Sequence, residues 1–144
     1  MPNHSYTYDN SLVLKAAGAA VVSSAAIATI LDTNNGASGN PSMFRADAVI
    51  DVTALDVATG DEEYDIIVQG SNSATFASGV VNLGAAIISV DGIAGSSADD
   101  VIGRYILPFQ NERNGTIYRY VRLYTLLRAA SSSITYKAFA AIRA

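Results

Sequence analysis

The chain has 144 residues, half of them apolar and only 15% charged, with a net charge of −4 at pH 7. A domain of this length buries enough surface to fold without a metal or a disulfide, and its apolar content excludes wholesale disorder. The lack of cysteine rules out disulfides and thiolate metal sites, and the single histidine, His4, rules out sites built from several histidines.

Residues 1–11 are polar and are expected to form a flexible arm, ahead of one domain over residues 12–144. The stretch Leu12–Leu31 is apolar and rich in alanine. Lys15, two interrupting serines and the small size of the side chains argue against a membrane span, and no basic residue precedes the stretch as in a secretory signal. We expect one or two short strands here, or an extended segment, covered by the body of the protein or by a neighbouring subunit.

Asn, Gly and Pro predict a loop over Asp32–Ser42. Strict alternation then predicts a half-buried strand over Phe44–Ala54, with apolar residues on one face and Arg, Asp and Thr on the other. An acidic turn leads to a second alternating strand over Tyr64–Gln69. The apolar run Val80–Val90 is predicted to be a buried strand with a bulge at Gly84.

The last third of the chain is the most regular. Tyr105–Phe109 alternates, and Pro108 predicts that this strand lies at a sheet edge or carries a bulge. Asn114-Gly115 predicts a tight turn, and Ile134–Ile142 alternates as a final strand. Short strands separated by turns predict an all-β fold, an antiparallel sandwich or barrel.

Between these elements, Tyr118, Tyr120, Arg122 and Tyr124 fall on one face of a predicted strand. Tyrosine and arginine are enriched at protein interfaces, which is the interpretation that we favour. An ordinary outer face comes next, and nucleic-acid binding comes last because the isoelectric point is 4.7. The mean hydropathy of +0.26 is high for a soluble monomer and also indicates surface buried by association.

Charge is unevenly distributed along the chain. Residues 1–100 hold two basic and twelve acidic residues, a net charge of −10, whereas residues 101–144 hold seven basic residues against Glu112 alone, a net charge of +6. Such asymmetry often marks a nucleic-acid or acidic partner. We favour the interpretation that the two parts interleave in one fold and neutralise each other. Sister subunits could also place acidic edges against basic ones.

Candidate catalytic and metal-binding residues are few. Carboxylates at Asp56 and Asp61–Asp65 could supply oxygen ligands to Ca²⁺, but their spacing is not that of an EF-hand, and exposed turn carboxylates are the commoner explanation. A Ser–His–Asp arrangement would need His4 from the arm, and the P-loop and G-x-S-x-G patterns are absent. Nothing selects a pair of carboxylates for glycoside hydrolysis. We therefore expect no enzymatic activity, no catalytic or metal-binding residue and no cofactor.

Four segments occur in a characteristic order: LVLKAAGA, DIIVQGSNSATF, GRYILPFQNERNGTIYRYVRLYTLL and SSSITYKAFAAI. The second contains Val68, Gln69 and Ser71 followed by an A-T-F segment, and the third contains an L-P pair followed by R-Y-x-R-L. In these patterns the chain resembles the jelly-roll cement, or decoration, proteins of tailed-bacteriophage capsids. The resemblance covers most of residues 12–143. Asp32–Ser42 and Asp61–Asp65 have no counterpart in it.

The resemblance implies an antiparallel jelly roll with an extended N-terminal arm. It further implies a structural virion protein that is made in the host cytoplasm and binds the outer capsid surface as a homotrimer. The partner would be the major capsid protein, whose subunits it would clamp against the pressure of packaged DNA, with no nucleic-acid or membrane partner. The candidate subunit or capsid interface comprises Leu12, Val13, Leu14, Val21, Val22, Tyr118, Tyr120, Arg122 and Tyr124.

Two other classes of function stay open. One is a phage fibre or a receptor- or carbohydrate-binding β module, which calls for exposed aromatic residues at loop tips. The other is an enzyme of unknown type, which calls for a deep pocket lined by carboxylates.

Arg119 and Arg122 are predicted to lie on opposite faces of one strand. One of them must then face the inner side or its rim and find a carboxylate there, because an unpaired buried charge is costly. We expect that acid to come from Asp47–Asp51. Arg119→Ala is predicted to lower stability more than Arg122→Ala.

Overall fold

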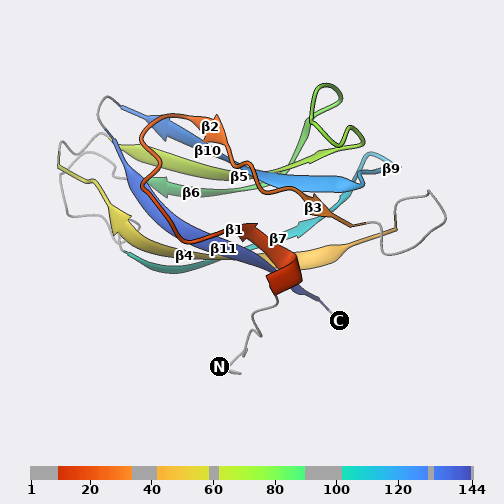
Figure 1. The fold of residues 1–144 in the computed structure, drawn as a ribbon, viewed down its shortest axis with the longest axis horizontal. Coiled ribbons are helices and arrows are strands. Elements are labelled where there is room, and N and C mark those ends of the chain that lie inside the picture. The colour runs from red at the N-terminus through yellow and green to blue at the C-terminus, as the bar shows by residue number, and fades with distance from the viewer. Residues whose placement is uncertain (1–9, 34–41, 59–61, 90–101, 130–131, 144) are drawn as a thin grey trace.

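A computed structural model describes residues 10–33, 42–58, 62–89, 102–129 and 132–143. Two antiparallel sheets face each other as a sandwich (Figure 1). The predicted all-β class is confirmed, since the described residues contain only the short 3-10 turn η1 (Asn10–Leu12) outside strands and loops. Of the two predicted forms, the sandwich is the one observed, because the two sheets do not close into a barrel.

The first sheet, sheet A, has the strand order β1-β11-β4-β7. Its strands are β1 (Val13–Lys15), β11 (Ile134–Ile142), β4 (Arg45–Leu55) and β7 (Gly103–Gln110). The first and the last of the sheet's strands in the chain, β1 and β11, are hydrogen-bonded neighbours.

The second sheet, sheet B, has the order β2-β10-β5-β6, and β3 pairs with β10 as well. Its strands are β2 (Ala25–Ala26), β3 (Leu31–Asp32), β10 (Tyr120–Arg128), β5 (Glu63–Ser71) and β6 (Val81–Ser89). A separate hairpin joins β8 (Glu112–Arg113) to β9 (Thr116–Ile117) between β7 and β10.

Period-two alternation builds the core. Alternate residues of β4 are buried between the sheets, as predicted: Ala46, Ala48, Ile50 and Val52. The centre of β4 is not half-buried, however, because Val49 on the opposite face is 0% exposed. There Val49 lies between Phe139 of β11 and Ile106 of β7, in an apolar row that the predicted outer face of Arg, Asp and Thr did not include.

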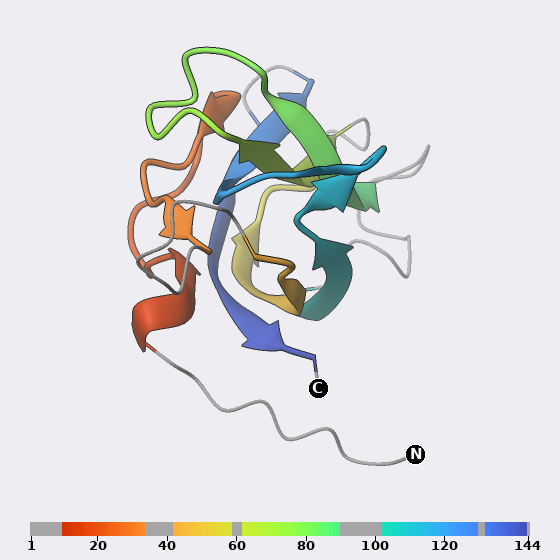
Figure 2. The same cartoon turned by 90° about the vertical axis from the view of Figure 1, so that its right-hand side faces the viewer.

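The two long edge strands, β6 of sheet B and β7 of sheet A, lie together on one side of the sandwich (Figure 2). Pro108 predicts an edge position or a bulge for β7, and the edge position is the one observed. The predicted bulge near Gly84 is present as a break in the β5–β6 register. The expectation that β6 is buried is wrong, because β6 is an edge strand and Ile87 on it is 62% exposed.

The predicted Asn114-Gly115 turn is confirmed. Both residues have positive φ, 53° and 82°, as the two central positions of a type I′ hairpin turn require. The turn joins β8 to β9, and the Gly115 N–H donates to the Glu112 carboxylate at 2.6 Å.

The alanine-rich stretch forms three short strands, one more than the largest number predicted, and the residues between them are irregular. It starts at the edge of sheet A as β1 and reaches the edge of sheet B as β2 and β3, so it runs along the side of the sandwich away from β6 and β7 (Figure 1). Residues 1–9 of the expected arm lie outside the described residues. Asn10 and Ser11, its last two residues, belong to η1.

Candidate interaction surface

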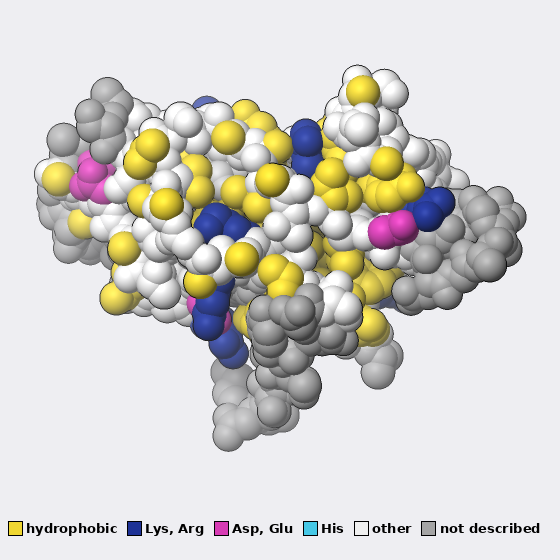
Figure 3. Space-filling model, in the orientation of Figure 1, with side chains coloured by type: hydrophobic (Ala, Val, Ile, Leu, Met, Phe, Trp, Pro, Cys, Tyr) yellow, Lys and Arg dark blue, Asp and Glu magenta, His cyan; other side chains and the backbone are white. Residues whose placement is uncertain are grey.

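The five predicted interface residues at the N-terminus have different surroundings. Leu14 is 0% exposed and part of the hydrophobic core, so it is withdrawn from the candidate interface. Leu12 and Val21 are half-buried and pack against that core, and Val13 is half-buried on β1. Val22 is 70% exposed. The residues that follow Lys15 are largely exposed, and Figure 3 shows apolar side chains in small groups over this face rather than in one patch.

The four predicted residues on and before β10 share one feature. Tyr120, Arg122 and Tyr124 point away from the core and are half-buried, while the residues between them are fully buried. Tyr118, just before the strand, is half-buried too. The predicted separation into an apolar and a tyrosine–arginine face is therefore confirmed.

Cross-strand neighbours define the surroundings of this face. Tyr124 lies between Ala26 of β2 and Ile67 of β5, which makes an apolar row across sheet B. The next row pairs Arg122 with Gln69, and the Arg122 Nε–H donates to the Gln69 side-chain oxygen at 3.0 Å.

Arg122 is also held by the loop between β5 and β6. This loop rises from the outer face of sheet B (Figures 1 and 2). It places the Phe76 ring against the Arg122 guanidinium, with 4.2 Å between the ring centroid and the Arg122 Cζ. Phe76 is buried although its φ is +56°, a conformation that side chains other than glycine rarely adopt. The Arg122 side chain therefore contacts Gln69 and Phe76 of its own chain, and the sequence pattern did not reveal these contacts.

Serine side chains hold the same loop together. The Ser71 hydroxyl donates to the Ser78 carbonyl at 2.8 Å and accepts from the Ser73 N–H at 3.0 Å. The Phe76 N–H donates to the Ser73 carbonyl at 3.0 Å. Serine side chains thus take over backbone hydrogen bonds that a strand would otherwise supply.

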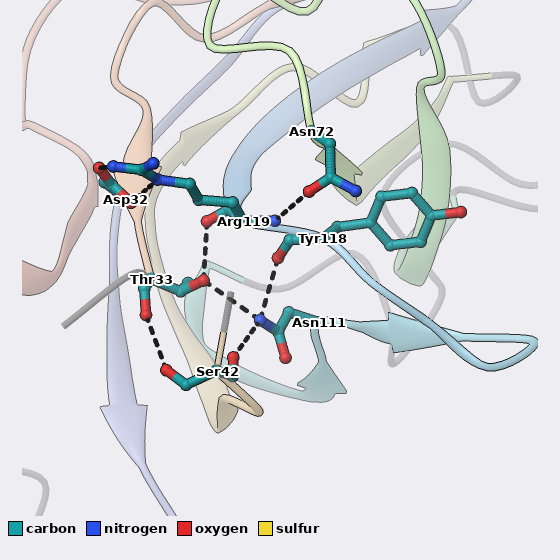
Figure 4. Close-up of polar contacts among 7 residues, drawn as sticks. All are labelled: Asp32, Thr33, Ser42, Asn72, Asn111, Tyr118 and Arg119. Carbon is teal, nitrogen blue, oxygen red and sulfur yellow. Dashed lines mark hydrogen bonds and ion pairs between the residues drawn. The ribbon is translucent and has the colours of Figure 1, made fainter. Parts of the chain in front are cut away.

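A polar network closes one end of the sandwich (Figure 4). At its centre, Asn111 is 0% exposed, directly after β7. Its side-chain oxygen accepts the Phe44 N–H at 2.7 Å, and its amide nitrogen lies within 3.1 Å of the Thr33 hydroxyl and the carbonyls of Ser42 and Tyr118. One side chain thereby joins segments that are up to 78 residues apart.

The backbone of Arg119 belongs to the same network. Its carbonyl accepts the Thr33 hydroxyl at 2.7 Å and the Thr33 N–H at 2.9 Å, and its N–H donates to the Asn72 side-chain oxygen at 2.9 Å. Sequence pattern did not single out Asn111, because a single asparagine in a polar segment has no pattern that marks it as buried.

The side chain of Arg119 corrects another expectation. It forms a bidentate pair with Asp32 of β3, with both nitrogen–oxygen distances at 2.9 Å. The expected acid from Asp47–Asp51 is wrong, because β10 pairs with β3 in sheet B whereas that acidic segment lies on β4 in sheet A. Arg119 sits at the rim, half-buried, as anticipated. The predicted order of the two alanine variants stays a prediction.

The charge split along the chain is neutralised by the fold, as we favoured. Every ion pair among the described residues joins a base from residues 104–143 to an acid from residues 32–65. The pairs are Arg104–Asp51, Arg119–Asp32, Arg128–Glu63, Arg128–Asp65 and Arg143–Asp47.

These pairs also account for much of the acidic turn considered for calcium. Arg128 contacts Glu63 and Asp65 at 2.9 and 3.3 Å, and Glu62 is buried. Asp61 lies outside the described residues. Within those residues, the acidic and histidine side chains form no cluster of three or more that could hold a metal ion.

Thr125, Tyr136 and Lys15 carry buried polar groups, and Tyr136 contacts both of the others. The Thr125 and Tyr136 hydroxyls, from opposite sheets, are 2.6 Å apart, and burial raises the pKa of Tyr136 to about 12. Lys15 donates to the Tyr136 carbonyl at 2.8 Å and lies over the Tyr136 ring. Burial lowers the pKa of Lys15 from its usual value.

His4, the candidate base, lies outside the described residues, and no helix among those residues has the length and hydropathy needed to cross a bilayer. No family model, curated protein or solved structure matches the chain. The interpretation of these surfaces therefore rests on their geometry and on the sequence itself.

Proposed function

We propose that this chain is a structural virion protein, a cement or decoration protein that binds the outer surface of a tailed-phage capsid as a homotrimer. In this role it stabilises contacts between subunits of the major capsid protein and performs no catalysis. The observation that supports the proposal most is the strand order of the sandwich, taken together with the segment order by which the sequence resembles that family.

The strand order fits a jelly roll. Setting aside the β8–β9 hairpin and counting β2 and β3 as one interrupted strand, the strands of the two sheets can be numbered in chain order. Sheet A then reads 1-8-3-6 and sheet B reads 2-7-4-5. Two interlocked Greek keys of antiparallel strands produce this order, and such double-sheet folds serve in viral capsids and in lectins. The jelly roll is thus part of the proposal.

The exposed surface also suits assembly. The row of Ala26, Tyr124 and Ile67 places apolar side chains on the outer face of sheet B, and Ile87 on the edge strand β6 and Val22, which precedes β2, are exposed aliphatic residues. Single exposed apolar residues are common, but a tyrosine in a row with aliphatic groups is typical of surfaces buried in oligomers.

The competing hypothesis of a fibre or a receptor- or carbohydrate-binding module is less well supported. Such modules present aromatic rings at loop tips, whereas Tyr120 and Tyr124 lie within β10. Specific binding on a glycan array, without binding to capsids, would favour that hypothesis.

The proposal is tested by light scattering and by sedimentation with expanded capsids. We expect a trimer that co-sediments with capsids and raises the temperature at which they rupture. Tyr124→Ser should weaken assembly or capsid binding, whereas Lys137→Gln, an exposed position on sheet A, serves as the matched control. A monomer that ignores capsids would contradict the proposal.

A further inference from the structure

Two arginines face each other at one end of sheet A. Arg45 begins β4, Arg143 follows β11, and the Arg143 N–H donates to the Arg45 carbonyl at 3.0 Å. Gln110 of β7 is the partner of Arg45 on its other side. Like charges on facing positions of neighbouring strands repel each other, so this row is unfavourable unless an anion lies close to it.

Only one of the two guanidinium groups has an acidic partner among the described residues. The Arg143 Nε is 2.7 Å from the Asp47 Oδ1, an ion pair without hydrogen-bond alignment. Arg45 is exposed, and in the described part of the chain its side chain has neither a hydrogen bond nor an ion pair. Its five N–H donors are thus available to a ligand.

These arginines border an open depression with a volume of about 500 Å³. Its lining is part cationic and part apolar: Arg45, Arg143, Gln110, Leu83, Pro108 and Phe109. A free phosphate could use only the cationic part. A carboxylate next to an aliphatic side chain on a peptide could use both parts, because a guanidinium fork matches a carboxylate in two parallel hydrogen bonds.

The rim of the depression disfavours an extended polyanion. The Gln110 amide donates to the Glu112 carboxylate at 3.1 Å, which places a negative charge beside the row. A nucleic-acid strand that passed over the arginines would meet this charge, whereas a single acidic side chain need not.

We propose that this depression binds an acidic–apolar segment of a partner polypeptide, with a carboxylate paired to Arg45 and an aliphatic side chain against Leu83, Pro108 and Phe109. Such binding is a property of the isolated chain and does not depend on the proposed capsid function.

The test is an NMR titration of the ¹⁵N-labelled 144-residue chain with the peptide acetyl-ALDELA-amide. We expect saturable shifts of the Arg45 Nε–H and of the Gln110 and Phe109 amides, and none with the neutral peptide acetyl-ALNQLA-amide. No shift at these groups would overturn the proposal. Inorganic phosphate that binds there as tightly as the peptide would reduce the site to an anion site and overturn the assignment to a polypeptide.

Variants separate a site from general charge attraction. Arg45→Gln should weaken peptide binding by about tenfold. Arg45→Lys keeps the charge but loses the paired N–H donors of the guanidinium, so its affinity should lie between those of the wild type and Arg45→Gln. Lys137→Gln removes the same charge from an exposed position on the same sheet and should change binding less than about twofold. Equal weakening by Arg45→Gln and Lys137→Gln would overturn the proposal.

Two controls complete the design. Arg45→Gln relieves repulsion with Arg143, so its unfolding temperature should not fall; if it fails to fold, the comparison of Arg45→Lys with Lys137→Gln decides the question. The same shifts on raising the protein concentration without peptide would show that a second copy supplies the acid, and would overturn the assignment to a different polypeptide.

Discussion

The Asn111 end of the sandwich and the outer face of sheet A hold their polar groups in opposite ways. At the Asn111 end, neutral groups are buried and each hydrogen bond replaces one that water can no longer make. On sheet A, ion pairs such as Arg104–Asp51 stay partly in water, which screens them. Burial, more than charge, therefore decides which polar contacts hold this fold together.

The largest expected effect comes from Asn111→Ala. The substitution leaves the buried Phe44 N–H without a partner and removes the hydrogen bonds to the Ser42 and Tyr118 carbonyls, and should cost about 3 kcal/mol of the free energy of unfolding. The measurement is urea unfolding monitored by circular dichroism.

Asn72→Ala is the matched control for this prediction. Asn72 is exposed; it accepts the Arg119 N–H of the same network and donates to the Ile117 carbonyl, so its loss should cost about 1 kcal/mol. An Asn111 variant as stable as the Asn72 variant would show that burial does not distinguish these contacts.

The next effect tests a buried pair between the sheets. Tyr136→Phe leaves the Thr125 hydroxyl without its partner and should cost about 1.5 kcal/mol, measured by the same unfolding experiment. Adding Thr125→Val should recover part of that loss, because both polar groups are then gone. Additive losses in the double variant would mean that the two hydroxyls are not coupled.

The third prediction concerns alkaline pH. Burial raises the pKa of Tyr64 and of Tyr136 to about 12, whereas a tyrosine in the unfolded chain ionises near pH 10. The unfolded chain therefore loses these protons first, so the stability they contribute is complete below about pH 10 and is lost as the pH rises towards 12.

Unfolding of wild type and Tyr136→Phe should accordingly differ by about 1 kcal/mol less at pH 11 than at pH 8. Lys15, whose pKa is lowered, acts in the opposite direction, but it is present in both proteins and cancels in the difference. A difference that stays constant over this range would contradict the raised pKa of Tyr136.

The smallest effect belongs to the surface ion pair. Arg104→Ala should cost about 0.5 kcal/mol, and less at about 1 M salt. Hydrogen bonding to Arg104 holds the pKa of Asp51 below its usual value, so this contribution is present above about pH 4 and lost as the pH falls through the pKa of the folded protein. If Arg104→Ala lowered the free energy of unfolding as much as Asn111→Ala does, and independently of salt, the surface ion pair would matter as much as the buried network.

The sequence predicted the parts that depend on local pattern. Alternation located the long strands other than β6, Asn114-Gly115 located the hairpin turn, and Pro108 indicated an edge or a bulge at β7, because each rests on backbone geometry within a few residues. It also indicated that the tyrosine–arginine face of β10 points outwards.

What the sequence left out depends on contacts between distant segments. The pairing of Arg119 with Asp32 follows from the pairing of β3 with β10, and the burial of Asn111 follows from the meeting of loops from both sheets. Periodicity indicates which face a side chain occupies, but not which segment lies across from it.

The proposed function is tested most directly by electron cryomicroscopy of capsids with this protein present and absent. We predict additional density on the outer surface, in threefold groups of sandwiches that each touch neighbouring capsid subunits. Particles whose outer surface is unchanged by the protein, at concentrations that saturate any binding, would contradict this role.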